Sequence, residues 1–437
     1  MAISRRTFLK AGVGVGAVGA VGVGYRQINK TKTQANIVIV GGGAAGIGIA
    51  NQLGHYLDGA TITVIEPRGF HWYQPGQTLL LAGAYTQVSD VISPNERFID
   101  ASVRWVEDSV IEYQPERNQV VTENGLLVNY DYLIVATGVE LRYDLIDGFD
   151  PQEIGQNGIT SIYYSPQAGI ASHQQAQAFA HSQGGKAIFT RPQGAMKCAG
   201  APMKATNLVE YFVAQTGHRD KFVFDYFTAE NFLFSVKVFD QRIREIWQQR
   251  SIDSHFQHTL TSVDTSRKQA TFQLADQSTH TVDWDFIHVA PPMTAIKTIR
   301  ESPLADNEQF KGYLEVDQYT MQHKRYSNIF GLGDNVGTPI GKTAASVKTQ
   351  IPVVTQNLTA LIKDKPLMAK WDGYTSCPMI LDVGHAMLWE FDFTLQPMTA
   401  LPFQVVDPLK SSRFAWKVKE SVIKPIYDMM LRGYTPM

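Results

Sequence analysis

The sequence predicts an α/β fold with two interleaved Rossmann-like domains, followed by a C-terminal helical region that docks on a membrane. Three observations lead to this prediction. An apolar stretch from residue 35, a glycine-rich turn and a second apolar stretch form a strand–turn–helix–strand unit. A further strand-like run, GGKAIFT at 184–190, begins a second unit. The last part of the chain, from residue 409, is a basic amphipathic segment.

Length and composition set the domain organisation. The 437 residues are 44% hydrophobic and 18% charged, with a formal net charge of −2. Such a chain can bury a large core, and its charge excludes nucleic-acid binding through bulk electrostatics. We expect a signal segment at 1–34, a first domain split between 35–140 and 285–365, a second domain at 141–284 and a C-terminal region at 366–437.

The N-terminus is typical of an export signal. Arg5 and Arg6 in SRRTFLK precede an apolar, Gly- and Ala-rich run from Ala11 to Gly24, the pattern of a twin-arginine signal. A transmembrane anchor is the alternative, but 14 small residues fall short of the roughly 20 that span a bilayer. No A-x-A cleavage site precedes Asn36, so the segment could remain as a tether. We expect a folded, cofactor-loaded protein on the periplasmic side of the bacterial cytoplasmic membrane, attached peripherally.

The first unit carries a dinucleotide fingerprint. Gly41, Gly43 and Gly46 make GxGxxG between a strand and a helix. The first glycine permits the tight turn, the second lets the backbone approach a pyrophosphate, and the third lets helix and strand pack closely. Glu66 follows at the end of the next strand, where an acidic side chain can accept both ribose hydroxyls.

Two later segments identify the dinucleotide as FAD. YDYLIVATG, with Thr137 and Gly138, and YSNIFGLGD, with Asp334, resemble the signatures of flavoproteins that have two dinucleotide-binding domains. In that family the aspartate contacts the ribityl and pyrophosphate part of FAD. The alternative for Asp334 is a helix N-cap, and one residue could serve both roles.

The second unit lacks the fingerprint that a nicotinamide cofactor needs. Its strand runs directly into RPQGAMKCAGAPMK, so Arg191, Pro192 and Gln193 stand where the backbone would have to approach a pyrophosphate. We therefore expect no nicotinamide partner and a different source of electrons.

The chain has two cysteines, Cys198 in KCAGAPMK and Cys377 in DGYTSCP. Small neighbours and nearby lysines favour a reactive thiolate at Cys198, although an isolated cysteine is more often a small buried hydrophobic residue. The two residues are 179 positions apart, and the sequence contains neither C-x-x-C nor H-E-x-x-H. No metal site is therefore predicted. An exported protein with two cysteines can form one disulfide.

Four segments together resemble the sulfide:quinone oxidoreductases, especially the two-cysteine type of mitochondria and some bacteria. They are KCAGAPMK, DGYTSCP, NVGTPIGKTAASVKTQIP and MMLRGY, and the resemblance covers about residues 35–437. Other members use a third cysteine before the ATG motif, whereas the run from Gln87 to Thr137 has none. This absence fits the two-cysteine type.

The resemblance implies a role for each matching residue. Cys198 and Cys377 would form a redox-active disulfide that hydrosulfide attacks, with the persulfide on Cys377 and the thiolate of Cys198 facing the flavin. A helix that begins at Lys342, Thr343 and Ala344 would point at the flavin ring, where its dipole and the lysine favour negative charge. An ordinary exposed lysine is the alternative for Lys342. Two further positions, Gln74 and Val110, would lie against FAD.

The C-terminal segment is predicted to meet the membrane. From Leu409 to Met437 it has six Lys or Arg residues and two acidic ones, interleaved with apolar side chains, a pattern of interfacial helices. A helix that packs its apolar face on the protein body is the alternative. In the family the quinone enters between these helices. Candidate walls of a quinone site are Trp389, Phe391 and Phe393, although aromatic stripes are commonly core.

The predicted function is oxidation of sulfide to a persulfide or polysulfide, with a membrane quinone as electron acceptor. The sulfur acceptor is not identified by the sequence. One alternative is the flavoprotein subunit of a flavocytochrome sulfide dehydrogenase, which passes electrons to a haem subunit. Another is a non-catalytic flavoprotein that senses redox state and recruits a partner.

Overall fold

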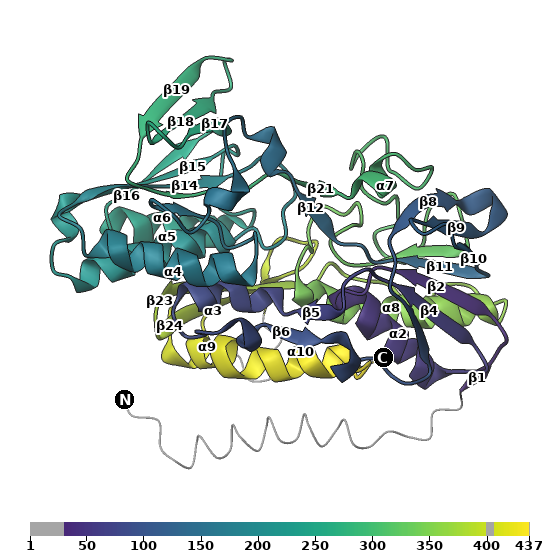
Figure 1. The fold of residues 1–437 in the computed structure, drawn as a ribbon. Coiled ribbons are helices and arrows are strands. Elements are labelled where there is room, and N and C mark those ends of the chain that lie inside the picture. The colour runs from purple at the N-terminus through teal and green to yellow at the C-terminus, as the bar shows by residue number, and fades with distance from the viewer. Residues whose placement is uncertain (1–29, 399–405, 437) are drawn as a thin grey trace, which may run out of the picture.

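The computed structural model describes residues 30–398 and 406–436, and two parallel sheets organise them (Figure 1). The first sheet has the strand order β22-β11-β2-β4-β7. Apart from the edge strand β7, its strands are almost wholly buried, because a parallel sheet is covered on both faces and its inner strands are therefore continuously apolar. These strands are β2 (Asn36–Val40), β4 (Thr61–Ile65), β7 (Val103–Val106), β11 (Tyr132–Val135) and β22 (Ile329–Gly331).

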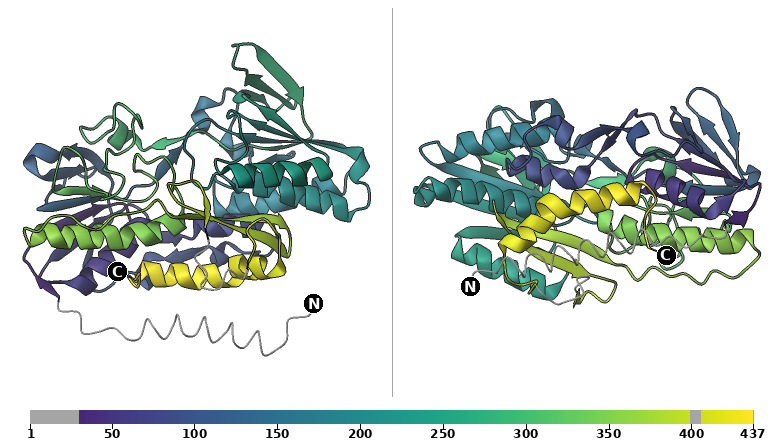
Figure 2. Two further views of the ribbon diagram at one scale, coloured as in Figure 1. Left: turned by 180° about the vertical axis from the view of Figure 1, so that it is seen from behind. Right: turned by 90° about the horizontal axis from the view of Figure 1, so that it is seen from below.

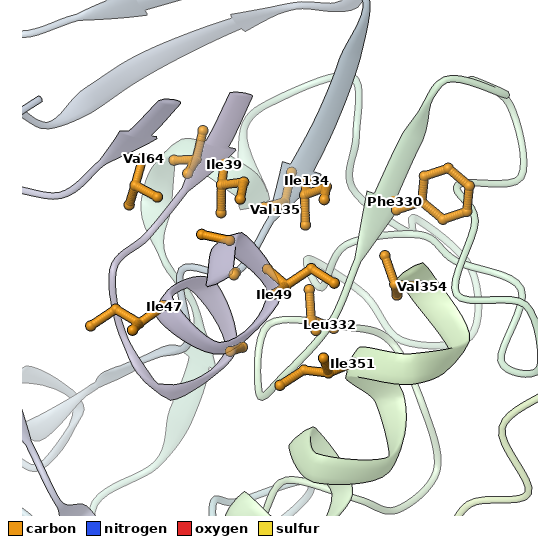
Figure 3. Close-up of a cluster of buried hydrophobic side chains, with 14 of the residues drawn as sticks. Ile39, Ile47, Ile49, Val64, Ile134, Val135, Phe330, Leu332, Ile351 and Val354 are labelled. Carbon is orange, nitrogen blue, oxygen red and sulfur yellow. The ribbon is translucent and has the colours of Figure 1, made fainter. Parts of the chain in front are cut away.

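Helices α2 (Ala44–Tyr56) and α8 (Ala344–Ile362) pack against each other beneath the first sheet. Figure 3 shows aliphatic side chains of the sheet, such as Ile39 and Ile134, facing Ile49 of α2 and Ile351 of α8. An antiparallel meander covers another part of this half of the molecule. It consists of β8 (Val110–Gln114), β9 (Gln119–Thr122) and β10 (Leu127–Asn129).

The second sheet has the order β13-β20-β14-β15-β16, again all parallel. Helices α4 (Pro166–Ala180), α5 (Ala201–Gln215) and α6 (Lys237–Gln249) cover one face, and a three-stranded meander lies on the other side (Figure 1). The sheet strands are β13 (Ile159–Thr160), β14 (Gly185–Arg191), β15 (Phe222–Thr228), β16 (Ile252–Phe256) and β20 (Phe286–His288). The meander strands are β17 (Thr259–Asp264), β18 (Gln269–Gln273) and β19 (Thr279–Asp283).

The chain crosses between the two sheets twice. These crossings pair as β12 (Val139–Leu141) and β21 (Met293–Ala295), which run antiparallel. The predicted α/β class with two Rossmann-like units is therefore confirmed. The remaining short elements are β1 (Thr31–Lys32), β3 (Leu57–Asp58), β5 (Phe70–Trp72), β6 (Ile92–Pro94), α3 (Gln77–Leu81) and α7 (Lys297–Arg300).

The sequence predicts a helical C-terminal region, but only its last part is helical in the structure. It begins with an antiparallel sheet of β23 (Thr375–Asp382), β24 (His385–Phe391) and β25 (Pro397–Met398). The helical part follows, as α9 (Arg413–Lys417), a π-turn at Val418–Val422 and α10 (Ile423–Leu431). Seen from below, α9 and α10 cross beneath both halves of the molecule (Figure 2). Among the described residues, no helix is long and apolar enough to cross a membrane.

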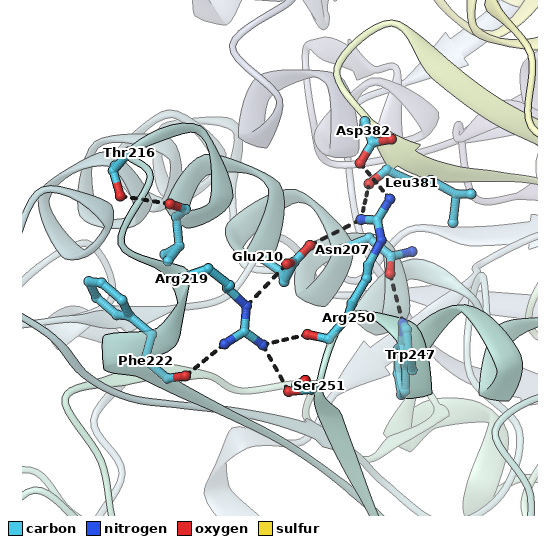
Figure 4. Close-up of polar contacts among 11 residues, drawn as sticks. Asn207, Glu210, Thr216, Arg219, Phe222, Trp247, Arg250, Ser251, Leu381 and Asp382 are labelled. Carbon is cyan, nitrogen blue, oxygen red and sulfur yellow. Dashed lines mark hydrogen bonds and ion pairs between the residues drawn. The ribbon is translucent and has the colours of Figure 1, made fainter.

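Polar contacts hold strand β23 against helix α5. Glu210 of α5 accepts hydrogen bonds from Arg219 and Arg250, each at 3.1 Å, and Arg250 also reaches Asp382 at the end of β23 at 2.8 Å (Figure 4). The amide of Asn207 donates to the carbonyl of Ile380 at 2.9 Å. The central part of α5 and the end of β23 are thereby fixed side by side.

Candidate active site

The glycine-rich turn is shaped by backbone contacts. Gly41 has a φ of +102°, and a Cβ there would lie 2.5 Å from the carbonyl oxygen of Ala136. A Cβ on Gly46 would lie only 1.8 Å from the carbonyl oxygen of Gly41. A Cβ on Gly43 would meet nothing within 4 Å. The first and third glycines are therefore needed for packing, while Gly43 opens onto free space at the start of α2.

Glu66 directly follows β4 beside this turn and is almost completely buried. Its carboxylate accepts hydrogen bonds from the backbone N–H of Gly42 at 2.8 Å and from Nε of Arg68 at 2.7 Å. Burial raises the pKa of Glu66, but the bonds from Arg68 and Gly42 outweigh it and hold the pKa below its ordinary value. The side chain is thus a buried carboxylate that is fixed in position, as a ribose-binding acid requires.

A cavity extends from Glu66 to Cys198 past the carboxyl ends of β2, β4, β11 and β22. Tyr427 and Lys419 of the C-terminal region line it together with residues that follow strands of both sheets. Ten of the predicted site residues are in its wall, namely Gly43, Glu66, Gln74, Thr137, Gly138, Cys198, Asp334, Lys342, Thr343 and Ala344.

The cavity fits a flavin dinucleotide. Within the described chain, the hydroxyls of Thr137 and Thr78 and the amide oxygen of Gln77 are buried without a hydrogen-bond partner, and buried polar groups need one. Gly43 and Gly138 each leave space where a side chain would project. The N-termini of α2 and α8 also open toward the cavity, where helix N–H groups and dipoles favour phosphate or negative ring charge.

Lys342 is buried, which contradicts the alternative that it is an exposed surface lysine. Its ammonium donates to the carbonyl of Asp334 at 2.6 Å and to that of Val336 at 2.9 Å. Burial lowers the pKa of Lys342 to about 8, although Asp334 opposes the shift. The helix that follows is capped by Thr343, whose hydroxyl accepts from the N–H of Ser346 at 3.1 Å, so the N-cap alternative for Asp334 is wrong.

Cys198 lies in the turn between β14 and α5. Its φ of +83° is in the left-handed region, a conformation that costs a non-glycine residue roughly 1–3 kcal/mol and clusters at functional sites. The carbonyl of Cys198 accepts a hydrogen bond from the N–H of Ala201 at 2.6 Å, which ties the residue to the first turn of α5. The strained backbone therefore presents the sulfur at the cavity wall.

Cys377 lies in the middle of β23 and is 3% exposed. A Cβ on Gly200 would lie 2.5 Å from its sulfur, so only glycine at that position lets the two segments approach. The structure has both cysteines as free thiols, and their side chains are hydrogen-bonded to each other. Cys377 itself is outside the cavity lining, but the adjacent Ser376 and Pro378 are part of it.

The pKa values of the two cysteines are shifted in opposite directions. The hydrogen bond from Cys377 holds the pKa of Cys198 well below its ordinary value, with further help from the ammonium groups of Lys204 and Lys419. The same hydrogen bond and burial raise the pKa of Cys377. Nζ of Lys204 donates to the sulfur of Cys198 at 3.5 Å. The pair is therefore poised as a thiolate at Cys198 and a thiol at Cys377.

Lys419 is a site residue that the sequence analysis missed, because it was counted among the cations of a surface segment. It is 4% exposed and reaches inward from the π-turn to donate to the carbonyl of Pro75 at 2.5 Å. Burial and the nearby Lys204 lower the pKa of Lys419 to about 7. Short π-helical turns are frequent at functional sites, but the sequence carried no signal that this one would form.

The aromatic quinone-site candidates lie in packed regions rather than in the cavity wall. Trp389 is fully buried and stacks on Phe239, with ring centroids 4.7 Å apart. Phe391 is 5% exposed and contacts the ring of Phe234. Phe393 packs on Trp371 with centroids 5.0 Å apart. Their positions favour the alternative that these rings form an ordinary core.

Val110 is also outside the cavity lining. It begins β8, and its side chain is buried in the core of the first domain. Its predicted contact with FAD is not supported by this position.

Comparison with known proteins adds independent information. A family model described as pyridine nucleotide-disulphide oxidoreductase matches residues 35–184. The mitochondrial sulfide:quinone oxidoreductase of Mus musculus is 34% identical over 410 residues, which cover 92% of this chain and 88% of that protein. The protein of the same name in Dictyostelium discoideum is 37% identical over 412 residues, covering 93% and 88%.

Solved structures show the same fold. The sulfide:quinone oxidoreductase of Aquifex aeolicus superposes with a TM-score of 0.75 and 20% identity, covering 91% of this chain and 92% of that one. The NDH2 of Plasmodium falciparum, solved in complex with NADH, superposes with a TM-score of 0.61 and 11% identity, covering 92% and 97%.

Proposed function

Since this chain belongs to the sulfide:quinone oxidoreductase family, we propose that it oxidises sulfide through FAD and passes the electrons to a quinone. The observation that carries this function is the hydrogen-bonded cysteine pair beside the dinucleotide cavity, with Cys198 and the two neighbours of Cys377 in the cavity wall. Bound FAD supplies an acceptor for two electrons that a quinone can draw off again. The enzyme's own residues bind and activate the sulfur.

We propose that Cys198 and Cys377 alternate between a disulfide and the two thiols seen in this structure. Hydrosulfide attacks the disulfide, forms a new S–S bond with Cys377 and releases Cys198 as a thiolate. Thiol–disulfide exchange is fastest when the leaving thiol has a low pKa. The lowered pKa of Cys198 and the ammonium of Lys204 support its role as leaving group and as the thiolate that faces the flavin.

The chain is proposed to be of the two-cysteine, mitochondrial-like type. Its higher identity to the mitochondrial proteins, 34% and 37%, than to the sulfide-quinone reductase of Aquifex aeolicus, 20%, supports this subtype. Identity to named quinone-linked enzymes over most of the chain also favours this function over a haem-linked dehydrogenase subunit or a non-catalytic redox sensor.

The test is a direct assay of the purified protein. We expect sulfide to bleach the absorption of tightly bound, non-covalent FAD, and a soluble quinone to restore it. NADH should not bleach it at a useful rate, because Arg191 of β14 fills the position where a nicotinamide dinucleotide would approach the second sheet. Failure of sulfide to bleach the flavin, or rapid bleaching by NADH, would contradict the proposed function.

We propose export on the basis of the N-terminal segment and membrane attachment on the basis of the C-terminal segment. Residues 1–29, which include the predicted twin-arginine signal, lie outside the described part of the structure. The proposed location is the periplasmic face of the cytoplasmic membrane, and fractionation of cells that express Arg5→Lys/Arg6→Lys protein tests it. Retention of the FAD-loaded variant in the cytoplasm would support export by this route, whereas normal export would oppose it.

The C-terminal segment has an inner and an outer face, which supports peripheral docking. Tyr427 and Leu431 are buried, whereas Phe414, Ile426 and Met429 are each about two-fifths exposed. Basic and apolar residues on one exposed face favour an interfacial position on anionic lipid. Deleting the segment is a poor test of docking, because the deletion would also strip residues from the cavity wall.

Point variants give a cleaner test. We expect Ile426→Ser/Met429→Ser to reduce binding of the full chain to vesicles of anionic lipid by roughly ten-fold, since two apolar side chains no longer enter the interface. Flavin bleaching by sulfide should be unchanged. The matched control is Leu127→Ser/Met368→Ser, which removes two exposed apolar side chains elsewhere. Equal vesicle binding by both double variants would show that docking does not use this face.

A further inference from the structure

The last helical part of the chain, residues 413–436, forms part of the wall of the FAD cavity, and we call it the strap. Lys419, Ile423 and Tyr427 line the cavity. Spaced four residues apart, they follow one face of the strap, whereas Met429 is exposed on another face. Seen from below, the strap crosses beneath both halves of the molecule (Figure 2). One segment therefore has an inner face at the cofactor site and an outer face toward the proposed lipid surface.

The second half of the strap packs on α2, the helix that begins at the glycine-rich turn. Nδ2 of Asn51 donates to the carbonyl of Leu431 at 2.6 Å. A Cβ on Gly48 would lie 3.1 Å from the carbonyl oxygen of Met430, so the two backbones approach closely there. These contacts show that α10 and α2 run in the same direction. Tyr427 precedes Met430 by about one helical turn and therefore lies beside the start of α2, where the turn receives the dinucleotide.

Tyr427 fastens the strap at the cavity wall. Its side chain is buried, and its hydroxyl is hydrogen-bonded to Nε2 of His71 at 2.8 Å. His71 is buried as well and lines the same cavity. Further along the strap, the ammonium of Lys424 donates to the carbonyl of Asp90 at 2.6 Å. Together with the bond from Lys419 described above, these contacts join the strap to one stretch of the first domain.

We propose that the strap retains FAD: the cofactor leaves only when the strap detaches from the first domain, and Tyr427 is the positioning residue that fastens it. Contacts of this kind open locally, at a lower free energy than global unfolding requires, and each bond that is lost makes opening more frequent. A lipid surface that binds the outer face holds the strap in place and so slows the loss of FAD. This last consequence rests on the proposed membrane docking, whereas retention of FAD by the strap does not.

Tyr143 provides a matched control for Tyr427. It is buried, and its hydroxyl is hydrogen-bonded to that of Ser161 at 2.6 Å. Neither Tyr143 nor Ser161 lines the cavity, and Tyr143 belongs to a separate hydrophobic core at the second sheet. Tyr427→Phe and Tyr143→Phe each remove one buried hydroxyl that is bonded to a side chain, so a general loss of stability affects both variants. Only Tyr427→Phe loosens the strap.

The first measurement is the rate at which FAD leaves the full-length, FAD-loaded protein after dilution, followed by the fluorescence of free FAD. We expect Tyr427→Phe to release FAD roughly ten-fold faster than wild type, because His71 is left without its partner. Tyr143→Phe should match wild type. Lys424→Met removes a half-buried contact of the strap and is a second variant in case Tyr427→Phe does not fold. It should release FAD about three-fold faster.

Limited digestion with trypsin shows whether the strap itself opens. Cleavage at its Lys and Arg residues should become faster in Tyr427→Phe and Lys424→Met, in parallel with FAD release, and should be unchanged in Tyr143→Phe. Equal rates of FAD release in wild type, Tyr427→Phe and Lys424→Met would overturn the inference. So would faster release without faster cleavage of the strap, because that result assigns the loss of FAD to another part of the cavity.

The second measurement repeats FAD release in the presence of vesicles of anionic lipid. We expect vesicles to slow release from wild type at least about three-fold, but not from Ile426→Ser/Met429→Ser, whose outer face has lost two apolar side chains. Vesicles that bind wild-type protein without slowing release would overturn the link between lipid and cofactor. If vesicles do not bind, the proposed docking fails, while release and digestion in solution still test the strap. None of these measurements depends on sulfide oxidation, so they remain decisive if the proposed activity is wrong.

Discussion

Cys198→Ser and Cys377→Ser are each expected to lose sulfide:quinone activity on the order of 10³-fold or more, as the loss of a covalent nucleophile does in other enzymes. Neither variant can form the disulfide that hydrosulfide is proposed to attack. The flavin should remain bound in both, because neither side chain holds the glycine turn or Glu66. The measurement is steady-state quinone reduction by sulfide, with the FAD content of each preparation as its control.

Although both variants should lose activity, their absorption spectra should differ. Cys377→Ser leaves the thiol of Cys198 at the cavity wall near Lys204, where its thiolate can give a long-wavelength charge-transfer band with the flavin in the absence of sulfide. Cys198→Ser leaves only the buried Cys377, whose pKa is raised, and should show no such band. A band in Cys198→Ser alone would reverse the roles of the two residues.

The band in Cys377→Ser should depend on pH with a definite sign. A thiol with a lowered pKa is a thiolate above that pKa, so the band should be present at high pH and disappear as the pH falls. The substitution also removes the hydrogen bond that is the chief cause of the low pKa of Cys198. The loss should therefore begin at a higher pH than for the unsubstituted pair. A band that strengthens on acidification would contradict the thiolate assignment.

Gly46→Ala is expected to prevent formation of soluble, FAD-loaded enzyme. The added Cβ would lie 1.8 Å from the carbonyl oxygen of Gly41, a backbone atom that cannot move without displacing the turn. Overpacking this severe costs on the order of 3–5 kcal/mol, a large part of the 5–15 kcal/mol that stabilises a typical domain. The measurements are soluble yield, bound FAD and thermal unfolding.

Gly43→Ala is the matched control, because it adds the same methyl group three residues earlier. Its Cβ would meet no protein atom within 4 Å, and its backbone φ of −77° suits alanine. We expect this variant to fold with near-normal stability but to retain at least about ten-fold less FAD, since the methyl group occupies space that the pyrophosphate needs. Equal FAD content in Gly43→Ala and wild-type protein would contradict the assignment of this turn to the cofactor.

Local sequence carried the information on the first domain and its cofactor. Gly41, Gly43, Gly46 and Glu66 act within one strand–turn–helix–strand unit, so their spacing alone predicts the turn and what it binds. The apolar runs of β2 and β11 predicted buried parallel strands for the same reason. The missing fingerprint after β14 likewise followed from the residues that adjoin that strand.

Other features depend on contacts between distant parts of the chain, which no local pattern specifies. Chemical reasoning and family resemblance suggested that Cys198 and Cys377 meet, but it is the packing of α5 on β23 and the bare Gly200 that bring their side chains together. Lys419 reaches the wall of the adjoining cavity from the π-turn. It did not stand out in the sequence, because a lysine has no signature until its neighbours are known.

By itself, the sequence determined the α/β class, the dinucleotide turn and the presence of two well-separated cysteines, because dihedral preference, hydrophobic period and residue spacing are local properties. Only the tertiary structure decided which side chains face the cavity. An amphipathic segment has the same helical period whether its apolar face meets a protein core or a lipid surface. For this reason Lys419 was counted as a surface cation, whereas packing buries it in the cavity wall. Trp389 was predicted to line a quinone site, but contacts with distant aromatic residues place it in the core, because a sequence does not show what an aromatic side chain packs against.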